Sequence, residues 1–421
     1  MPGKEQIITV ESLPESIQTG ATYIIKQPNP NSYTHGMFKY PCKFIPEIPR
    51  WGIKTYLPEK NGIIFDPFSG SGTTLLEANI NGIDAYGTEI DDIAKLIIKV
   101  KTTVLQPVQI ALLDKYYGEI INRISQTEIE PFIPAIANLK HWFSEKTINE
   151  LGRMKVYIDN IEDRDIQDFF KLCMASIIKR VSNADDTSPK PYVSNKVIKI
   201  PPDVEKEFAS VFFRYKQMML NLSAIKIMGN TEIIQGDALD FSVPAGVDLA
   251  ITSPPYINAF DYGRTMRLEN LWLDTLTEEI LRMKKRKYVG TEKINAKKEK
   301  SELGILQKSN FLKEYYDQIA DQDEKRSLIV KKFFEDMETN LHLVYDQMNE
   351  GGKYVIVIGN STIRKVKVES WKVIEEIANK MGFKTVQHFN YIIQNPYIRI
   401  PRKNMGGKIN KDYVLVLEKG V

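Results

Sequence analysis

The chain contains the stretch GIIFDPFSGSGTTLLEANI at residues 62–80, and we expect the fold to be organised around it. The apolar run 62–65 predicts a buried strand, and the run 75–80 predicts a helix. Gly70 and Gly72 lie in the turn between them, where glycine allows backbone angles that are closed to other residues. The first N–H groups of a helix lack partners within the helix and point at the same place. The stretch therefore predicts a site for a carboxylate, phosphate or ribose group at the carboxyl end of a parallel strand.

The composition is that of an ordinary soluble globular protein. The 421 residues are 43% hydrophobic and 26% charged, with a formal net charge of +3. With so small a net charge, any contact with nucleic acid must come from local basic patches. Two cysteines and four scattered histidines make no disulfide framework and no metal-ligand cluster, so we expect no metal. A polar N-terminal region without a signal peptide and the lack of a membrane-spanning stretch predict a cytoplasmic protein with no membrane partner.

The rest of the chain predicts an α/β protein with a doubly wound, mostly parallel sheet and a helical insertion. Further strands are expected at 6–10, 22–26, 83–91, 231–238, 247–252, 353–359, 385–393 and 412–418, the last two as a closing antiparallel pair. Helices are expected at 93–103, 110–124, 137–143, 166–180 and 202–228, between the strands 83–91 and 231–238. Gly351 and Gly352 predict a break before the strand 353–359. The expected segments are a leader (1–34), a first part of the main domain (35–100), the insertion (101–229) and a second part (230–421).

Two strands end in groups that can contact a ligand. Glu89 follows the glycine loop by about twenty residues, where a carboxylate commonly accepts both hydroxyl groups of a ribose. We choose Glu89 for this role and Asp91 second, with an ordinary solvated acid as the alternative. The apolar strand 247–252 runs directly into Ser253-Pro254-Pro255-Tyr256. Because the carboxyl ends of parallel strands share one sheet edge, we expect both sites to face one pocket.

The stretch DPFSGSGTT, followed later in the chain by SPPY, resembles the two signature motifs of S-adenosylmethionine-dependent DNA amino-methyltransferases. The segment HGMFKYPCKFIP at 35–46 is similar to a segment that closes over the methionine end of the cofactor in that family. The resemblance implies a class I, Rossmann-like methyltransferase fold, S-adenosyl-L-methionine as cofactor and double-stranded DNA as substrate. It covers 35–100 and 230–420. Asp237, in a GDA sequence, would by the same match accept from the adenine amino group of the cofactor.

The resemblance implies two sets of site residues. Those that would contact the cofactor are Lys43, Phe44, Asp66, Pro67, Phe68, Gly70, Ser71, Gly72, Thr73, Thr74, Glu89 and Asp237. Those of the catalytic loop 253–256 are Ser253, Pro254, Pro255 and Tyr256. Alternatives for the individual residues are an ordinary packed loop around Lys43 and an ordinary strand-end acid at Asp237.

The catalytic loop predicts direct methyl transfer to an exocyclic amine of a base. The amine is a poor nucleophile, so the Ser253 hydroxyl and the Pro254 carbonyl would accept its two hydrogens and turn its lone pair toward the methyl group. Tyr256 would stack on the base, which must be flipped out of the duplex. In the resembled family SPPY usually accompanies cytosine N4, so we expect a site-specific cytosine-N4 enzyme of a restriction–modification system. Adenine-N6 DNA methylation, RNA base methylation and a cofactor-binding protein without catalysis are the alternatives.

The Pro41-Cys42 pair favours a different chemistry only weakly. Cytosine-C5 methyltransferases use a Pro-Cys nucleophile because attack on the ring is covalent. In those enzymes the pair follows the glycine loop, whereas here it precedes it.

Basic residues near the catalytic loop are candidates for contacts to DNA phosphates. The run 282–300, expected to be a basic loop, carries nine Lys or Arg residues, and a second basic loop is expected at 398–404. The candidates are Arg264, Lys284, Lys285, Arg286, Lys287, Arg399, Arg402 and Lys403.

The glycine loop comes first in this chain and the helical insertion precedes SPPY, whereas most cytosine-N4 enzymes of this type place the catalytic motif before the cofactor loop. Target recognition is therefore expected in 101–229, in 282–310 or in both. We expect 101–229 to help hold DNA, with a structural cap or a dimer surface as the alternative. A cognate restriction endonuclease is the expected genetic partner, and no pattern specifies an oligomeric state.

Overall fold

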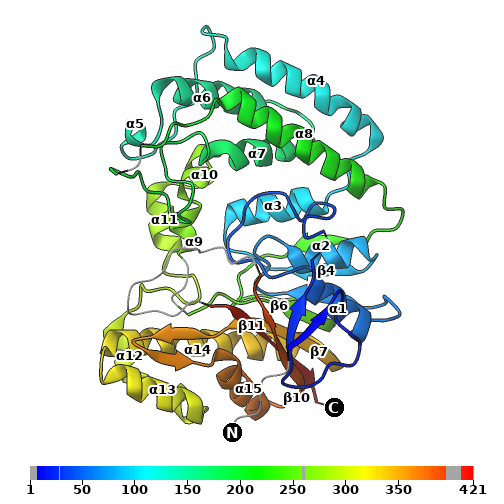
Figure 1. Ribbon diagram of the computed structural model, residues 1–421, viewed down its shortest axis with the longest axis vertical. Helices are drawn as coiled ribbons and strands as arrows, with labels where there is room; N and C mark the ends of the chain where they lie inside the picture. Colours follow the sequence, from blue (N-terminus) through cyan, green and yellow to red (C-terminus); the bar gives the residue numbers. More distant parts are fainter. Residues whose placement is uncertain (1–6, 28, 197, 258–260, 395–408, 421) are drawn as a thin grey trace.

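The computed structural model describes residues 7–27, 29–196, 198–257, 261–394 and 409–420 (Figure 1). Its strands are β1 (Ile7–Val10), β2 (Thr22–Ile25), β3 (Ile63–Asp66), β4 (Asp84–Gly87), β5 (Thr231–Ile233), β6 (Val247–Thr252), β7 (Met348–Gly359), β8 (Ser361–Ile363), β9 (Val366–Val368), β10 (Phe383–Ile392) and β11 (Lys411–Lys419). The helices that precede β5 are α1 (Glu47–Tyr56), α2 (Thr73–Ile80), α3 (Asp92–Thr102), α4 (Pro107–Ile124), α5 (Leu139–Trp142), α6 (Glu145–Asp159), α7 (Arg164–Ile178) and α8 (Val204–Ser223). Those that follow β6 are α9 (Tyr262–Thr265), α10 (Arg267–Trp272), α11 (Glu278–Lys284), α12 (Ala296–Ser301), the 3₁₀ helix η1 (Gly304–Gln307), α13 (Asn310–Ala320), α14 (Glu324–Gln347) and α15 (Ser370–Met381).

The sheet is doubly wound, as expected. The described residues form a nine-stranded sheet in the order β1-β2-β10-β11-β7-β6-β3-β4-β5. β3 lies between β6 and β4 and is parallel to both, so the order of the strands reverses between β3 and β6. β11 runs antiparallel to its neighbours β7 and β10, which confirms the closing antiparallel pair. In an open sheet of this kind, ligands bind at the carboxyl ends of the strands where the order reverses.

Helices cover both faces of the sheet. On one face, Ile64, Ile251 and Val355 pack with apolar residues of α1, α2 and α3. On the other face, Phe65 and Ile356 pack with residues of α13, α14 and α15. Buried strand residues that alternate between the two faces therefore hold the three layers together.

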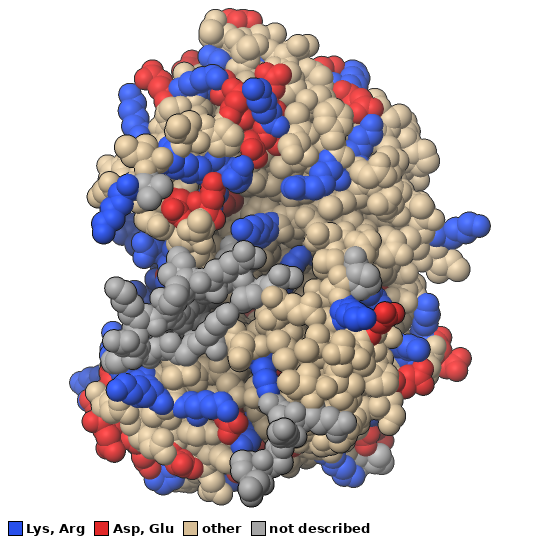
Figure 2. All heavy atoms as spheres, in the orientation of Figure 1, with Lys and Arg blue, Asp and Glu red and all other residues tan. Residues whose placement is uncertain are grey.

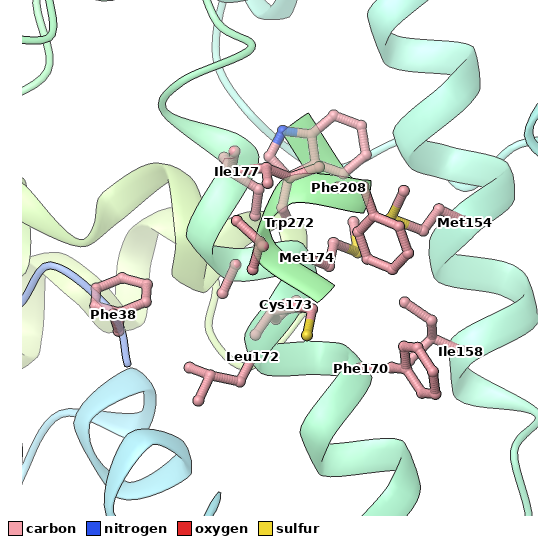
Figure 3. Close-up of a cluster of buried hydrophobic side chains, with 14 of the residues drawn as sticks. Phe38, Met154, Ile158, Phe170, Leu172, Cys173, Met174, Ile177, Phe208 and Trp272 are labelled. Carbon is pink, nitrogen blue, oxygen red and sulfur yellow. The ribbon is translucent and has the colours of Figure 1, made fainter. Parts of the chain in front are cut away.

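A separate helical part lies beside the sheet (Figure 1). The helices α4, α6, α7 and α8 share a core with α3 and α10, and the side chains that meet there include Phe170, Phe208 and Trp272 (Figure 3). Met37, Phe38 and Tyr40 belong to the same core. The segment before α1 is therefore packed against the helical part as well as against the sheet.

Several boundaries differ from those predicted. β4 and β5 end earlier than the expected strands 83–91 and 231–238, so Glu89 and Asp237 lie in the loops beyond them. Gly351 and Gly352 do not precede the strand but lie within β7, at an irregularity in its register with β6. The run 282–300 is partly helical, because α11 ends and α12 begins within it. No helix of the described ranges has both the length and the apolar character needed to cross a membrane.

Candidate active site

The carboxyl ends of β3, β4 and β6 surround a cavity that opens to solvent. Of the predicted residues, the cavity is lined by Lys43, Phe44, Pro67, Phe68, Gly70, Ser71, Thr73, Glu89, Asp237, Ser253 and Pro255. The same cavity is lined by Tyr40, Cys42, Thr88, Leu239, Lys287 and Tyr288, which the sequence had not indicated as cavity residues. The two sequence motifs therefore meet at one site.

The glycine loop has the backbone that its sequence predicted. Gly70 and Gly72 have φ angles of +50° and +73°, in the left-handed region that favours glycine. A Cβ atom at Gly72 would also lie 2.9 Å from Cγ1 of Ile98 on α3. Gly72 begins α2 without a side-chain cap, so the first N–H groups of this helix remain available near the cavity.

Asp66 joins the glycine loop to the strand of the catalytic loop. Its Oδ1 accepts from Oγ1 of Thr252 at 2.6 Å and from the Phe68 N–H at 3.1 Å. Burial raises the pKa of Asp66 to about 6, although these hydrogen bonds oppose the rise. Asp66 itself does not line the cavity. The position of Asp66 indicates that it holds β3 and β6 in register at the site. No pattern in the sequence indicated that Thr252 would be its partner.

Glu89 is held in place by three backbone donors. Oε2 accepts from the Gly70 N–H, and Oε1 accepts from the N–H groups of Ile90 and Asp91, each at 2.8 Å. Burial raises the pKa of Glu89 to about 8, and the three donors oppose the rise. The bond to Gly70 links the loop after β4 directly to the glycine loop. Asp91, the second choice, instead caps α3 by accepting from Ala94.

Asp237 lies in a tight turn that follows β5. Its side chain accepts from the Leu239 N–H at 2.9 Å, and its backbone pairs with Asp240. Gly236, with a φ of +115°, allows the turn. The turn places Asp237 and Leu239 in the cavity wall.

A network of mostly buried polar side chains contacts the glycine loop and α2. Nε2 of His35 and the Arg50 guanidinium both bond Glu77 on α2, at 2.8 and 2.6 Å. Nζ of Lys101, which is fully buried, donates to the Ser71 carbonyl at 2.6 Å. Lys43 donates to the His35 carbonyl, and burial lowers the pKa values of both lysines. The network ties the segment 35–46 to α2 and to the loop.

The network predicts that stability falls in acid. Burial lowers the pKa of His35 from 6.5 to about 4, although the hydrogen bond to Glu77 opposes this. Between pH 6.5 and 4 the His35 side chain therefore binds a proton in the unfolded chain but not in the folded protein. The contribution of neutral His35 to the free energy of unfolding is complete above pH 6.5 and is lost as the pH falls toward 4. The loss should be about 3 kcal/mol in urea unfolding between pH 7.5 and 4. The variant His35→Gln should lose this dependence, whereas the control His342→Gln, at an exposed histidine, should keep it. Equal slopes in all three proteins would contradict the assignment.

The residues of the catalytic loop divide into two groups. Ser253 and Pro255 line the cavity, whereas Pro254 and Tyr256 do not. Pro254 is buried, and the Tyr256 hydroxyl donates to Oδ1 of Asp412 on β11 at 2.5 Å. Cys42 of the Pro-Cys pair lies in the wall of the same cavity.

The candidate DNA-contacting residues do not form one group. Arg264 and Arg286 are exposed. Lys284 pairs with Asp92, and Lys285 pairs with Asp261, so both are engaged within the protein. Lys287 is exposed and also lines the cavity. The remaining candidates, Arg399, Arg402 and Lys403, lie outside the described residues. Figure 2 shows Lys and Arg side chains on both the helical part and the sheet part of the face in view.

Within the described part of the chain, no group of three or more His, Cys, Asp and Glu side chains is arranged to hold a metal ion.

Comparison with known proteins identifies the family. A family model described as DNA methylase matches residues 4–99. The type II methyltransferase M.MvaI of Kocuria varians is 25% identical over 95% of this chain and 91% of its own length. M.BsoBI of Geobacillus stearothermophilus is 28% identical over 59% of this chain and 54% of its own. These matches support the DNA amino-methyltransferase family for this chain, and with it a methyltransferase that acts on DNA.

Among solved structures, an rRNA methyltransferase, aviRa from Streptomyces viridochromogenes, aligns with 89% of this chain and 85% of its own at 9% identity. The TM-score of 0.30 is too low for this likeness to support an argument.

Proposed function

We propose that this enzyme transfers a methyl group from S-adenosyl-L-methionine to N4 of a flipped cytosine at a specific site in duplex DNA. The observation that carries the proposal is that Ser253 and Pro255 line the same cavity as Glu89 and the glycine loop. A neutral serine at the first position of the SPPY loop favours cytosine N4 by its resemblance to enzymes of that type. Adenine N6 also presents two hydrogens, so adenine-N6 methylation is the second candidate.

The cavity fits the proposed cofactor. Oγ of Ser71 is buried and has no hydrogen-bond partner in the described structure, although Ser71 lies in the cavity wall. Glu89 would bind the ribose hydroxyls, Asp237 would accept from the adenine amine, and Lys43 and Phe44 would enclose the methionine end. The bound cofactor supplies an electrophilic methyl group.

The residues of the chain would act on the base. The Ser253 hydroxyl and the Pro254 carbonyl would accept the two amine hydrogens and direct the lone pair of the amine toward the cavity. Pro254 and Pro255 restrict the backbone of the loop, so this geometry is set before the base arrives. The ring of Tyr256 would stack on the flipped base. Orientation, rather than an acidic or basic side chain, would supply most of the rate enhancement.

The names of the relatives suggest a biological setting. M.MvaI and M.BsoBI are type II methyltransferases. A role as the modification enzyme of a restriction–modification system, with a cognate endonuclease as genetic partner and the cytoplasm as location, is therefore the proposed context.

The proposal predicts a specific product. Nucleosides from the DNA of an unmodified host that expresses this chain should contain N4-methylcytosine by mass spectrometry. The variant Ser253→Ala should lower the amount on the order of 100-fold while cofactor binding stays measurable, because an amine acceptor is lost but the cavity is not. Ser125→Ala, at an exposed serine that ends α4, is the control and should behave as wild type.

Other products would redirect the proposal. N6-methyladenine in place of N4-methylcytosine would support the second candidate and reject the use of Ser253 to choose cytosine. Methylated nucleosides in RNA alone would reject DNA as the substrate of the proposed reaction.

A further inference from the structure

The hydroxyl of Tyr256 ends in a buried hydrogen-bonded cluster. Asp412, 6% exposed, accepts from Tyr256 at Oδ1 (2.5 Å) and from the Tyr391 hydroxyl at Oδ2 (2.9 Å). Tyr256 belongs to the loop after β6, Tyr391 to β10 and Asp412 to β11. One carboxylate therefore joins the catalytic loop to two strands on the far side of β7.

The backbone opposite Asp412 leaves room for the tyrosine ring. Gly359, at the end of β7, is the register partner of Asp412. A Cβ atom at position 359 would lie 2.8 Å from Cε2 of Tyr256 and 3.2 Å from its Cζ. Real Cβ atoms are not found at 2.8 Å from a ring carbon, so only glycine fits beneath this ring. The paired strands β7 and β11 thus provide both the acceptor for the Tyr256 hydroxyl and the space that its ring occupies.

Tyr391 connects the cluster to the cofactor side of the site. Burial and Asp412 raise the pKa of the Tyr391 hydroxyl, and a nearby backbone group of Ile45 opposes the rise. Ile45 directly follows Lys43 and Phe44, which line the cavity. The chain of contacts from Ile45 through Tyr391 and Asp412 to Tyr256 spans from the cavity wall to the catalytic loop.

Two contacts of this kind restrict the ring more than either would alone. A tyrosine ring turns about two side-chain torsions, and a hydroxyl held by a fixed acceptor, with glycine beneath the ring, defines both. The acceptor is itself fixed by a second donor, and hydrogen bonds to a carboxylate are among the stronger ones.

We propose that Asp412 is a positioning residue, which, held by Tyr391, sets the plane of the Tyr256 ring so that the ring can stack on the flipped target base. This inference rests on the proposed function, in which Tyr256 stacks on the base. Stacking requires parallel planes, so a ring free to rotate would hold the base, and therefore its amine, in the wrong orientation for transfer.

The test compares Asp412→Ala, Asp412→Asn and Tyr256→Phe in the full chain. With plasmid DNA, Asp412→Ala should lower kcat at least 10-fold, and Tyr256→Phe, which keeps the ring but loses the hydroxyl, should show a similar loss. The double variant Asp412→Ala/Tyr256→Phe should have a kcat no lower than that of the less active single variant, because both changes remove the same contact. Asp412→Asn keeps one acceptor and should recover part of the loss. The affinity for S-adenosyl-L-methionine should stay within 3-fold of wild type.

The fluorescence of a base analogue reports whether the target base is stacked, and it therefore distinguishes a positioning role of Asp412 from a general loss of structure. With 2-aminopurine at the target position of a duplex that wild type methylates, Asp412→Ala should alter the fluorescence of the bound complex, and the control Asp248→Asn should not. Asp248 lies near the amino end of β6, away from the carboxyl end that leads into the catalytic loop, and accepts from the Ile63 N–H. If Asp412→Ala does not fold, Asp412→Asn and Tyr256→Phe still test the inference.

Three outcomes would overturn the inference. These are an unchanged kcat in Asp412→Ala and Tyr256→Phe, multiplicative losses in the double variant, and a loss of cofactor affinity as large as the loss of kcat. Failure of the proposed function is seen separately, because it appears as the wrong methylated base in the wild-type enzyme.

Discussion

The variant Glu89→Ala should bind S-adenosyl-L-methionine about 100-fold more weakly than wild type. Its carboxylate is the proposed acceptor for the ribose hydroxyls and also the partner of three backbone N–H groups, including that of Gly70. A buried donor left without a partner costs about 1–3 kcal/mol. Loss of the ribose bonds and of the anchor on the glycine loop therefore readily reaches the roughly 2.7 kcal/mol that a 100-fold change requires.

Isothermal titration calorimetry would measure this effect. Glu89→Gln keeps a carbonyl acceptor and should lose only about 10-fold. Glu232→Ala, at an exposed acid on the neighbouring strand β5, is the matched control and should bind as wild type does. An affinity for Glu89→Ala within 3-fold of wild type would show that Glu89 does not contact the cofactor.

The variant Trp272→Ala should lower the free energy of unfolding by about 3–5 kcal/mol. Trp272 is fully buried in the core of the helical part (Figure 3). Its ring packs edge-to-face on Phe143, with the ring centroids 5.5 Å apart. Its Nε1 has no hydrogen-bond partner among the described residues, so the loss comes from packing and not from a hydrogen bond. The same core includes Tyr40, which lines the cavity, so the cavity wall should be weakened with it.

Urea unfolding followed by circular dichroism would test this. Phe213→Ala, at a residue of α8 that is 57% exposed, is the control and should change the stability by less than about 1 kcal/mol. A loss below about 1 kcal/mol for Trp272→Ala would mean that the helical core is not part of the cooperative unit. A second, earlier transition would mean that the helical part unfolds separately from the sheet.

Local structure around the motifs was predictable because short-range patterns determine it. The run of apolar residues before Asp66, the glycines after it and the helix-forming residues beyond correspond to β3, the loop and α2. The strand before Ser253 has the predicted bounds, and the helices expected at 110–124, 166–180 and 202–228 lie close to theirs, whereas α6 was not predicted. Backbone preferences of a few neighbouring residues are sufficient for such predictions.

Prediction was less accurate where pairing or packing overrides local preference. β4 is as long as its pairing with β3, and β5 is as long as its pairing with β4, so both strands stop before the acids that the sequence placed at their ends. The glycine pair within β7 is accommodated by an irregular register with β6 rather than by a break. The basic run is divided because Lys284 and Lys285 find acidic partners from other parts of the chain.

By itself, the sequence determined the fold class, the glycine loop, the catalytic loop and the acids that face the cavity, because each depends on residues close together in the chain. Only the tertiary structure decided which distant side chains meet. Thr252 bonds Asp66 across 186 positions, and Asp412 bonds Tyr256 across 156. Such contacts depend on the order and register of strands and on the packing of helices. Buried polar groups then pair with whichever partners the fold brings within reach, and no local pattern specifies those partners.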